Sequence, residues 1–241
     1  MTEARASYGV DAPMVLAGLA LGGVAELGVA AACFAAGWTI LAVILLVGGL
    51  MLVAGAAFYA HTTLRGKFRV WDAELDALGL AGDERVLDLG CGRGLVLIKA
   101  AARVPAGHAT GVDLWTSDQS GNSQDAAFAN ARTEGVAGRV ELVTGDMRAL
   151  PFEDGTFDLV VSSLAVHNIP DADGRAKAVA EALRVLRPGG RLRLADFRHT
   201  ADYATVLREQ GAVDVEVRDL GWRFWYGGPH ARTALVGARR P

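Results

Sequence analysis

The sequence is short of cysteine and of excess charge of either sign, and both shortages exclude classes of protein. Only two cysteines occur in 241 residues, Cys33 in an apolar segment and Cys91 in a glycine-rich turn. A disulfide framework is therefore excluded, which is in keeping with a reducing compartment. The cysteines and histidines also lack the spacing of a zinc site, so we expect no metal. The formal net charge of −3 offers no strongly basic surface, and we expect no nucleic-acid partner.

Charge is nearly missing between residues 14 and 60, where Glu26 stands alone. Gly37 and Trp38 divide this run into two halves, 14–36 and 38–60, each long enough for a membrane span of about 20 residues. The residues before it lack the basic region of a signal peptide, and we expect residues 1–13 to form an exposed tail. A transmembrane hairpin is therefore predicted over residues 1–63. The alternative is a helical pair buried in a soluble core, but the rest of the chain has too little apolar surface to cover it.

Small residues and one acid mark the first span. Gly18-x-x-x-Gly22 and Gly28-x-x-x-Ala32 are predicted to form faces for close helix approach. Glu26 lies near the middle of the span, where insertion scales give a charged carboxylate a cost of at least ~2 kcal/mol. We expect a protonated Glu26 that hydrogen-bonds at the helix pair or at the interface of a homo-oligomer. A polar substrate or proton path is the alternative.

Basic residues set the expected orientation of the hairpin. Arg65, Lys67 and Arg69 follow the second span, whereas the loop between the spans carries no basic residue. The positive-inside rule then places both ends of the hairpin in the cytoplasm. We expect a multi-pass protein of the cell membrane whose larger domain faces the cytoplasm.

Residues 64–80 are predicted to form an amphipathic linker helix. Phe68, Trp71, Leu75 and Leu78 recur at helical spacing, with Lys67 and three acidic residues on the other face. Such a helix could lie at the bilayer interface, which suits tryptophan and basic side chains. It could equally cover a cleft in the following domain, residues 81–241.

From residue 84 onward, strand and helix patterns alternate, which predicts an α/β domain with a doubly wound parallel sheet. The strands are expected at 85–89, 108–113, 139–144, 159–163, 191–196, 212–219 and 231–239. The helices are expected at 94–103, 123–134, 174–186 and 201–210. Residues 186–190 read as a turn before the fifth strand, in which Pro188 ends the preceding helix.

The segment 86–94, Val-Leu-Asp-Leu-Gly-Cys-Gly-Arg-Gly, organises this domain. An apolar strand ends near Asp88, and Gly90, Gly92 and Gly94 then allow a sharp turn into a helix. This arrangement predicts a nucleotide-like cofactor site at the carboxyl edge of the sheet. The dinucleotide fingerprint requires a glycine where Leu95 stands, and Asp88 would attract a cation and repel a pyrophosphate. An NAD-dependent oxidoreductase is therefore disfavoured.

This segment resembles the first motif of the class I S-adenosylmethionine-dependent methyltransferases. The resemblance covers roughly residues 84–241. Residues 150–158 resemble the loop before the fourth strand in the subgroup that methylates quinone precursors and related lipids. It implies a Rossmann-like, mostly parallel seven-stranded sheet whose last strand is antiparallel, with S-adenosyl-L-methionine as cofactor. It also implies that Asp113 accepts both ribose hydroxyls and that Asp146 accepts from the adenine amine beside Met147. The expected cofactor-binding residues are Asp88, Gly90, Cys91, Gly92, Gly94, Asp113, Leu114, Gly145, Asp146, Met147 and Ser162.

His167 and Asn168 are the candidate catalytic residues, since they follow the fourth strand at the same sheet edge. A histidine can deprotonate a hydroxyl, phenol or quinol acceptor near neutral pH. The alternative is that His167 only bonds backbone and Asn168 only holds the loop.

The roles of two further segments stay open. Residues 115–122 line the cofactor or cap the next helix, and the aromatic run 221–230 forms a substrate lid, touches the membrane or packs on the sheet.

These observations predict a membrane-anchored transferase that methylates a lipophilic small molecule such as a quinol, isoprenoid or lipid. One alternative is methylation of a small hydroxyl, thiol or amine compound, with the hairpin as a tether. Another is a membrane protein that senses a nucleotide without catalysis.

Overall fold

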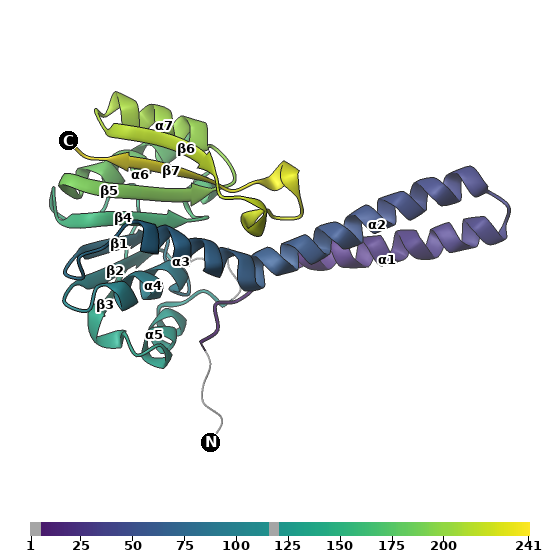
Figure 1. The fold of residues 1–241 in the computed structure, drawn as a ribbon, viewed down its shortest axis with the longest axis horizontal. Helices are drawn as coiled ribbons and strands as arrows, with labels where there is room; N and C mark the ends of the chain where they lie inside the picture. The colour runs from purple at the N-terminus through teal and green to yellow at the C-terminus, as the bar shows by residue number, and fades with distance from the viewer. Residues whose placement is uncertain (1–5, 116–120) are drawn as a thin grey trace, which may run out of the picture.

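The structure is a computed structural model that describes residues 6–115 and 121–241. An α/β domain carries a seven-stranded sheet in the order β3-β2-β1-β4-β5-β7-β6, and a long helical hairpin projects from one side of it (Figure 1). β7 runs antiparallel to both of its neighbours, and the pairs among the first five strands are parallel. The predicted mostly parallel sheet with a final antiparallel strand is therefore confirmed.

The strands lie close to their predicted positions. Their bounds are β1 Arg85–Leu89, β2 His108–Asp113, β3 Val140–Thr144, β4 Phe157–Ser163, β5 Leu186–Asp196, β6 Val213–Asp219 and β7 Ala234–Arg239. β1 is central, and consecutive side chains such as Val86 and Leu87 enter the cores on opposite faces of the sheet. Parallel strands covered on both faces are expected to be mostly apolar, and in β1 the buried run Val86, Leu87 and Leu89 is interrupted only by Asp88.

The start of β5 differs from the prediction. β5 begins at Leu186, and its register against β4 shifts between Phe157 and Leu159. The predicted turn 186–190 is therefore an irregular first part of the strand, and the preceding helix ends before Pro188, at Arg184. A Cβ on Gly190 would lie 2.8 Å from the Arg187 carbonyl oxygen, so glycine is required where the strand bends.

Helices cover both faces of the sheet. α3 Lys67–Ala77, α4 Leu95–Arg103 and α5 Gln124–Thr133 pack on one face, and α6 Ala172–Arg184 and α7 Thr200–Glu209 pack on the other. Trp71 of α3 is 1% exposed and donates through Nε1 to Ser163 Oγ at 2.9 Å. The Trp71 side chain is therefore buried against the domain, whereas the two predicted positions of the helix, at a bilayer interface and over a cleft, can hold together.

The hairpin consists of α1 Pro13–Ala35 and α2 Thr39–His61, which match the two predicted apolar halves. Both helices have the length and composition of membrane spans. Their large apolar side chains are mostly exposed, with Met14, Leu21 and Ile40 between 70% and 81% exposed. The described chain therefore does not bury this pair in a soluble core.

The helix contact uses glycines other than those predicted. A Cβ on Gly23 would lie 2.8 Å from Val53 Cγ2, and one on Gly49 would lie 2.9 Å from Leu27 Cγ. By contrast, a Cβ on Gly18 or Gly28 would meet nothing within 4 Å in the described chain, and one on Gly22 would lie 3.7 Å from Leu52 Cδ1. Of the first predicted face, Gly22 therefore meets α2 and Gly18 does not, and Gly28 points away from α2. The reason is rotational: Gly23 and Gly49 lie on the sides of their helices that face each other.

Glu26 faces the second helix of the hairpin. Its Oε2 atom lies 2.6 Å from the place that a Cβ on Gly48 would take, so the missing side chain leaves room for the carboxyl group. This position agrees with the predicted place of Glu26 at the helix pair.

α2 continues through a π-helical turn, Thr62–Gly66, directly into α3 (Figure 1). Gly66 sits so close to the carbonyl of Arg223 that any Cβ would collide with it at 1.8 Å. The aromatic run 221–230 therefore packs on the base of the hairpin, where the rings of His61 and Trp222 stack 5.1 Å apart. Thr62 Oγ1 also donates to the Trp225 carbonyl at 2.6 Å.

Residues 6–12 do not form the exposed tail that the sequence predicts. This segment, here called the N-terminal strap, runs from α5 to the base of the hairpin. The Ser7 N–H donates to Asn130 Oδ1 at 2.8 Å, and Asn130 Nδ2 donates back to the Ser7 carbonyl at 2.9 Å. The ring of Tyr8 meets Phe68 edge-on at 5.4 Å. The prediction of an exposed tail was wrong because these hydrogen bonds join residues that are distant in sequence. Local sequence patterns do not predict such contacts.

Candidate functional site

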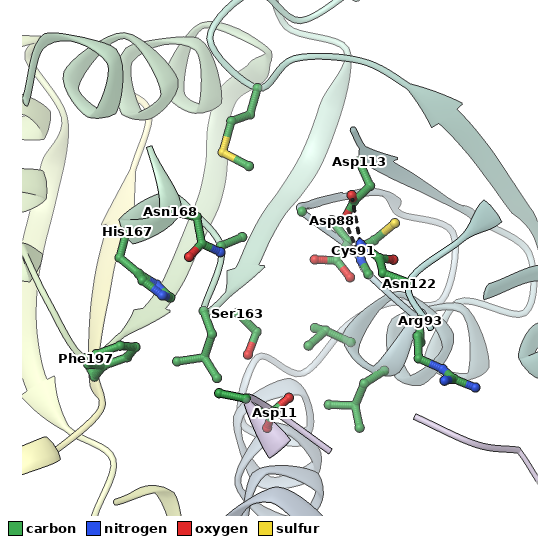
Figure 2. A pocket seen from close by; sticks show the side chains of 18 of the residues that line it. Asp11, Asp88, Cys91, Arg93, Asp113, Asn122, Ser163, His167, Asn168 and Phe197 are labelled. Carbon is green, nitrogen blue, oxygen red and sulfur yellow. Dashed lines mark hydrogen bonds between the residues drawn. The ribbon is translucent and has the colours of Figure 1, made fainter. Parts of the chain in front are cut away.

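A cavity of about 630 Å³ lies at the carboxyl edge of the sheet, where the loops after β1, β2, β3 and β4 meet. Its size falls within the range of ~300–1,000 Å³ that is usual for small-molecule sites. Figure 2 shows Asp88, Asp113 and Cys91 on one side of it and His167 and Phe197 on the other. Asp11 of the strap lies near Ser163 in the same view. The cavity thus has a half beside the glycine turn and a half beside His167.

The glycine turn fits tightly against the loop that follows β4. Gly90, Gly92 and Gly94 all have positive φ angles, of 67°, 52° and 84°. A Cβ on Gly90 would lie 2.2 Å from the Cβ of Ala165, so this residue has to be glycine. Gly94 is the N-cap of α4 and sets the start of the helix without lining the cavity.

Asp88 is a buried acid with an incomplete set of partners. Its Oδ2 accepts a hydrogen bond from the Leu97 N–H at 2.9 Å, whereas its Oδ1 has no hydrogen-bond partner in the described chain. Burial raises the pKa of Asp88 to about 8, and the charge of Asp113 adds to this rise, against the lowering effect of the Leu97 N–H. Burial also raises the pKa of the adjacent Cys91 thiol well above its usual value, so Cys91 is no thiolate nucleophile.

Asp113 ends β2 and is fixed by N–H donors. Its Oδ2 accepts from the Gly92 N–H at 2.8 Å, and its Oδ1 accepts from the Trp115 N–H at 2.7 Å. Asn122 Nδ2 lies 3.3 Å from Oδ1, which Figure 2 marks. A carboxylate has about four lone-pair sites, so these three bonds leave capacity for one further donor, such as a hydroxyl group in the cavity.

Both predictions for residues 115–122, that they line the cofactor site or that they cap the next helix, are supported by the residues at the end of this segment. Asn122 lines the cavity, and Ser123 Oγ caps α5 by accepting from the Ala126 N–H at 3.1 Å. Residues 116–120 of this predicted loop lie outside the described residues.

Asp146 lines the cavity but is already paired. Arg148 donates to both of its carboxylate oxygens, with Nη2 at 2.6 Å from Oδ2 and the backbone N–H at 2.9 Å from Oδ1. Hydrogen bonds from Arg148 lower the pKa of Asp146, which keeps it a hydrogen-bond acceptor. Met147 lines the cavity beside it.

Most of the predicted cofactor residues are brought together by the fold. Those that line the cavity are Asp88, Gly90, Cys91, Gly92, Asp113, Leu114, Gly145, Asp146 and Met147. Gly94 and Ser162 do not line it. Ser162 is buried and donates to the Leu89 carbonyl at 2.8 Å, which ties β4 to β1, while Ser163 lines the cavity in its place.

His167 and Asn168 both line the opposite half of the cavity. His167 Nδ1 lies 2.8 Å from Oδ1 of Asp196, a carboxylate that is 2% exposed at the end of β5. The Asp196 carboxylate also accepts from the N–H groups of His167 and Phe197 at 3.1 and 2.8 Å, and from the Tyr203 hydroxyl at 3.3 Å. The Phe197 ring contacts the imidazole edge-on at 4.5 Å. The imidazole is therefore held by the close approach of Nδ1 to the Asp196 carboxylate, although Nδ1 makes no hydrogen bond of good geometry in the described chain, and by the Phe197 ring.

Asp196 was missed by the sequence reasoning although a signal existed. It is an acid at the carboxyl end of a predicted strand, as Asp113 is, and β5 is the neighbour of β4 in the sheet. The spacing between residues 167 and 196 gives no hint of their contact, because it depends on how β4 and β5 pair.

A second polar cluster, at the hairpin end of the cavity, was also missed. The Asp11 carboxylate accepts from Lys67 Nζ at 2.8 Å, from Thr63 Oγ1 at 2.9 Å and from the Tyr226 hydroxyl at 2.7 Å. Burial raises the pKa of Tyr226 well above its usual value, and the charge of Asp11 adds to the rise. Lys67, predicted on the polar face of its helix, is 4% exposed. The cluster joins the strap, the hairpin base and the aromatic run.

Comparison with known proteins identifies the central part of the chain. Residues 86–190 match the family model described as a methyltransferase domain. This segment is a class I S-adenosylmethionine-dependent methyltransferase domain. S-adenosylmethionine is the cofactor of such domains, and the domain is that of an enzyme.

Curated relatives of the methyltransferase domain share more than a third of its residues. The chain is 38% identical over 136 residues to the ubiquinone/menaquinone biosynthesis C-methyltransferase UbiE of Dinoroseobacter shibae. The matched segment covers 55% of this chain and 50% of that protein. It is 36% identical over 133 residues to UbiE of a Ruegeria species, with the same two coverages. The chain therefore spans about half the length of these relatives.

Solved structures share the fold of the methyltransferase domain. A geranyl diphosphate methyltransferase in complex with geranyl diphosphate and sinefungin has a TM-score of 0.56 and 20% identity, and covers 71% of this chain and 78% of its own. The [4+2]-cyclase SpnF has a TM-score of 0.57 and 23% identity, and covers 70% and 81%. Because a cyclase and a methyltransferase share this fold, these two likenesses establish architecture alone.

The cavity of the methyltransferase domain fits its cofactor on two observations. Asp88 Oδ1, buried and without a hydrogen-bond partner in the described chain, suits a nearby cationic group. Asp113 has a remaining acceptor site at the neighbouring strand end, where a hydroxyl group of a ribose could bind. The glycine turn leaves space for such a ligand, since Gly90 and Gly92 line the cavity without side chains.

Proposed function

We propose that this protein is a membrane-anchored methyltransferase that acts on a lipophilic acceptor such as a quinol, an isoprenoid or a lipid at the cytoplasmic face of the membrane. The observation that carries the proposal is the composition of one cavity. The glycine turn and His167 line it, and so do Val15 of α1 and Tyr59 of α2, which belong to the apolar hairpin. Methyl transfer and membrane contact thus share one site.

The cofactor residues are proposed from their places in the cavity. Asp88, with the turn at Gly90 and Gly92, would hold the amino-acid and sulfonium end, Asp113 the ribose, and Asp146 with Met147 the adenine. Gly94 and Ser162 would act indirectly, by fixing the start of α4 and the position of β4. When bound, S-adenosylmethionine supplies a methyl group on a positively charged sulfur, which needs an aligned nucleophile and little covalent help.

His167 is proposed as the general base, with Asp196 as its positioning residue. The acceptor hydroxyl gives its proton to His167 Nε2, which makes the oxygen, or the ring carbon conjugated with it, nucleophilic. S-adenosylmethionine bound beside the glycine turn would supply the methyl group to that atom and would leave as S-adenosylhomocysteine, while His167 would hold the proton of the acceptor. General-base assistance of this kind contributes roughly 10²–10⁴-fold. Asn168 would hold the acceptor or the loop beside His167.

The UbiE relatives narrow the class of acceptor. They are named as C-methyltransferases of ubiquinone and menaquinone biosynthesis, which makes a quinol ring the first acceptor to test. On such a ring, methylation at carbon is followed by loss of the ring proton, so that one methyl group replaces one hydrogen.

Membrane anchoring is proposed from the apolar, exposed hairpin. α1 and α2 have the length of spans, and Arg65 is exposed just beyond α2, with Arg69 exposed one turn further on. Basic residues at this end favour a cytoplasmic catalytic domain. Glu26 at the helix pair and the outward Gly28 leave association of copies open to test.

The decisive experiment incubates the detergent-purified protein with methyl-labelled S-adenosylmethionine and a native lipid extract. We expect label in an extractable quinol or isoprenoid lipid, and its loss in a His167→Gln variant that still binds S-adenosylhomocysteine. Label only in small water-soluble hydroxyl, thiol or amine compounds would contradict the lipophilic acceptor. Cofactor binding without any transfer would favour a sensor.

A further inference from the structure

We infer that an acyl- or isoprenoid-tailed acceptor enters the active site sideways from the bilayer, through an opening at the base of the hairpin. This membrane-side portal is formed by Ala12, Val15, Tyr59, Tyr226 and Ala231. The inference rests on the proposed function and deepens it, because it assigns the residues that receive the apolar tail while His167 receives the reacting head.

The portal is continuous with the reaction site. Its five residues line the same cavity as Asp88, Asp113 and His167. They come from the strap, from the first turn of α1, from the last turn of α2 and from the loop before β7. An acceptor can therefore lie with its head at the sheet edge and its tail at the hairpin without crossing a wall of the domain.

The portal is open on the side of the hairpin. Val15 lines the cavity and is also 50% exposed, so its side chain stands at the rim. The preceding residue in the helix is apolar and exposed as well, since Met14 is 81% exposed, and at the base of the hairpin Trp222, stacked on His61, is 45% exposed. In a hairpin that spans a membrane, the first turn of α1 and the last turn of α2 lie at one membrane surface, so this rim meets the lipid.

The polar side-chain groups of the portal and of the cluster beside it hydrogen-bond within the protein. The Tyr226 hydroxyl donates to the Asp11 carboxylate at 2.7 Å, and the Tyr59 hydroxyl donates to the Asp11 carbonyl at 3.1 Å. Lys67 Nζ donates to both Asp11 carboxylate oxygens at 2.8 Å. The two tyrosine rings pack edge-on with their centroids 5.0 Å apart, and they line the same cavity as Val15. An apolar tail fits this lining, because it needs no hydrogen bonds.

The test narrows the portal with a bulky side chain of the same polarity class. Val15→Trp is compared with Leu21→Trp, a change on the same helix at a site that is 70% exposed and does not line the cavity. The acceptors are two naphthoquinols that lack the ring methyl group, one with a long polyprenyl chain in lipid nanodiscs and one without a chain.

We expect Val15→Trp to raise the KM of the polyprenyl acceptor by roughly tenfold, the equivalent of about 1.4 kcal/mol. The KM of the chainless acceptor and the Kd of S-adenosylhomocysteine should stay unchanged, and Leu21→Trp should change none of the three. An unchanged KM for the polyprenyl acceptor, or an equal rise for both acceptors, would overturn the portal.

A binding readout separates failure of the portal from failure of the proposed acceptor. If the unaltered protein methylates neither naphthoquinol, the quinol acceptor is wrong, and the portal is then judged by crosslinking in nanodiscs with a benzophenone-tipped polyprenyl chain. Crosslinks concentrated in residues 12–15 and 226–231 support it. Crosslinks spread along the lipid-facing sides of both helices without such enrichment refute it.

Discussion

At the scale of single residues, Asp88 and Asp113 line the same half of the cavity but differ in their hydrogen-bond partners. Asp88 is buried with one unpartnered oxygen in the described chain, whereas Asp113 is held by backbone N–H groups. A cationic ligand beside Asp88 favours the ionised carboxylate. Cofactor binding near neutral pH should therefore release a proton from Asp88, and the ribose should bind to an acceptor already in place.

The raised pKa of Asp88 predicts a pH-dependent stability. In the folded protein the carboxyl is protonated up to about pH 8, whereas in the unfolded chain it ionises near its ordinary value of 3.8. The folded state thus binds more protons between these values, and the free energy of unfolding falls as pH rises through this window, by up to roughly 1.4 kcal/mol per unit. Asp88→Asn should flatten this fall.

Thermal unfolding of the cofactor-free protein in detergent, followed from pH 4 to 9, measures the effect. Asp83→Asn makes the same chemical change at an exposed site and should leave the slope as it is. Equal slopes in Asp88→Asn and the unaltered protein would contradict the assigned environment of Asp88.

The contact between Asp196 and His167 predicts a kinetic effect of Asp196→Asn. Loss of the carboxylate that orients Nδ1 should lower kcat by about 10²-fold or more, within the range of general-base catalysis. KM and the Kd of S-adenosylhomocysteine should hold within about twofold, because the acceptor and cofactor contacts stay. Tyr203→Phe, which touches the same carboxylate but not the imidazole, is the control. A rise in KM without a fall in kcat would assign Asp196 to acceptor binding.

At the scale of helices and strands, packing across the hairpin depends on Gly23 and Gly49. Gly23→Leu forces atoms against Val53, whose backbone N lies 3.0 Å from the Cβ position, and should destabilise the hairpin by about 1–3 kcal/mol. Gly28→Leu adds the same side chain where nothing lies within 4 Å in the described chain, and should be nearly neutral. Thermal unfolding in detergent compares the two. Equal losses would show that the helices pack on another face.

Local patterns were sufficient for most elements of the catalytic domain. β1 and β2 match their predicted bounds, because apolar runs between glycine turns are local signals. The start of β5 was misplaced because the Pro-Gly-Gly sequence is typical of a turn, and the pairing with β4 overrides that preference. The predicted small-residue faces of α1 did not include Gly23 for a similar reason: a glycine-rich helix offers several such faces, and only the position of α2 selects one.

At the scale of the whole molecule, the site has two origins. The half beside the glycine turn follows from one motif and was predictable from spacing, as Asp88 and Asp113 show. The hairpin end depends on contacts between segments far apart, such as Asp11 with Lys67 and Tyr226. Through these contacts, the strap, the hairpin and the domain line one cavity. The sequence of each segment taken alone could not predict this.

In the proposed function, the carboxyl edge of the sheet binds S-adenosylmethionine through Asp113. Isothermal titration of S-adenosylhomocysteine into the full-length protein in detergent tests it most directly, because binding needs no acceptor. We expect saturable heat at one site per chain, a loss of at least about tenfold in affinity in Asp113→Ala, and unchanged affinity in the exposed Asp83→Ala. Absence of heat in the unaltered protein, or equal affinity in both variants, would contradict it.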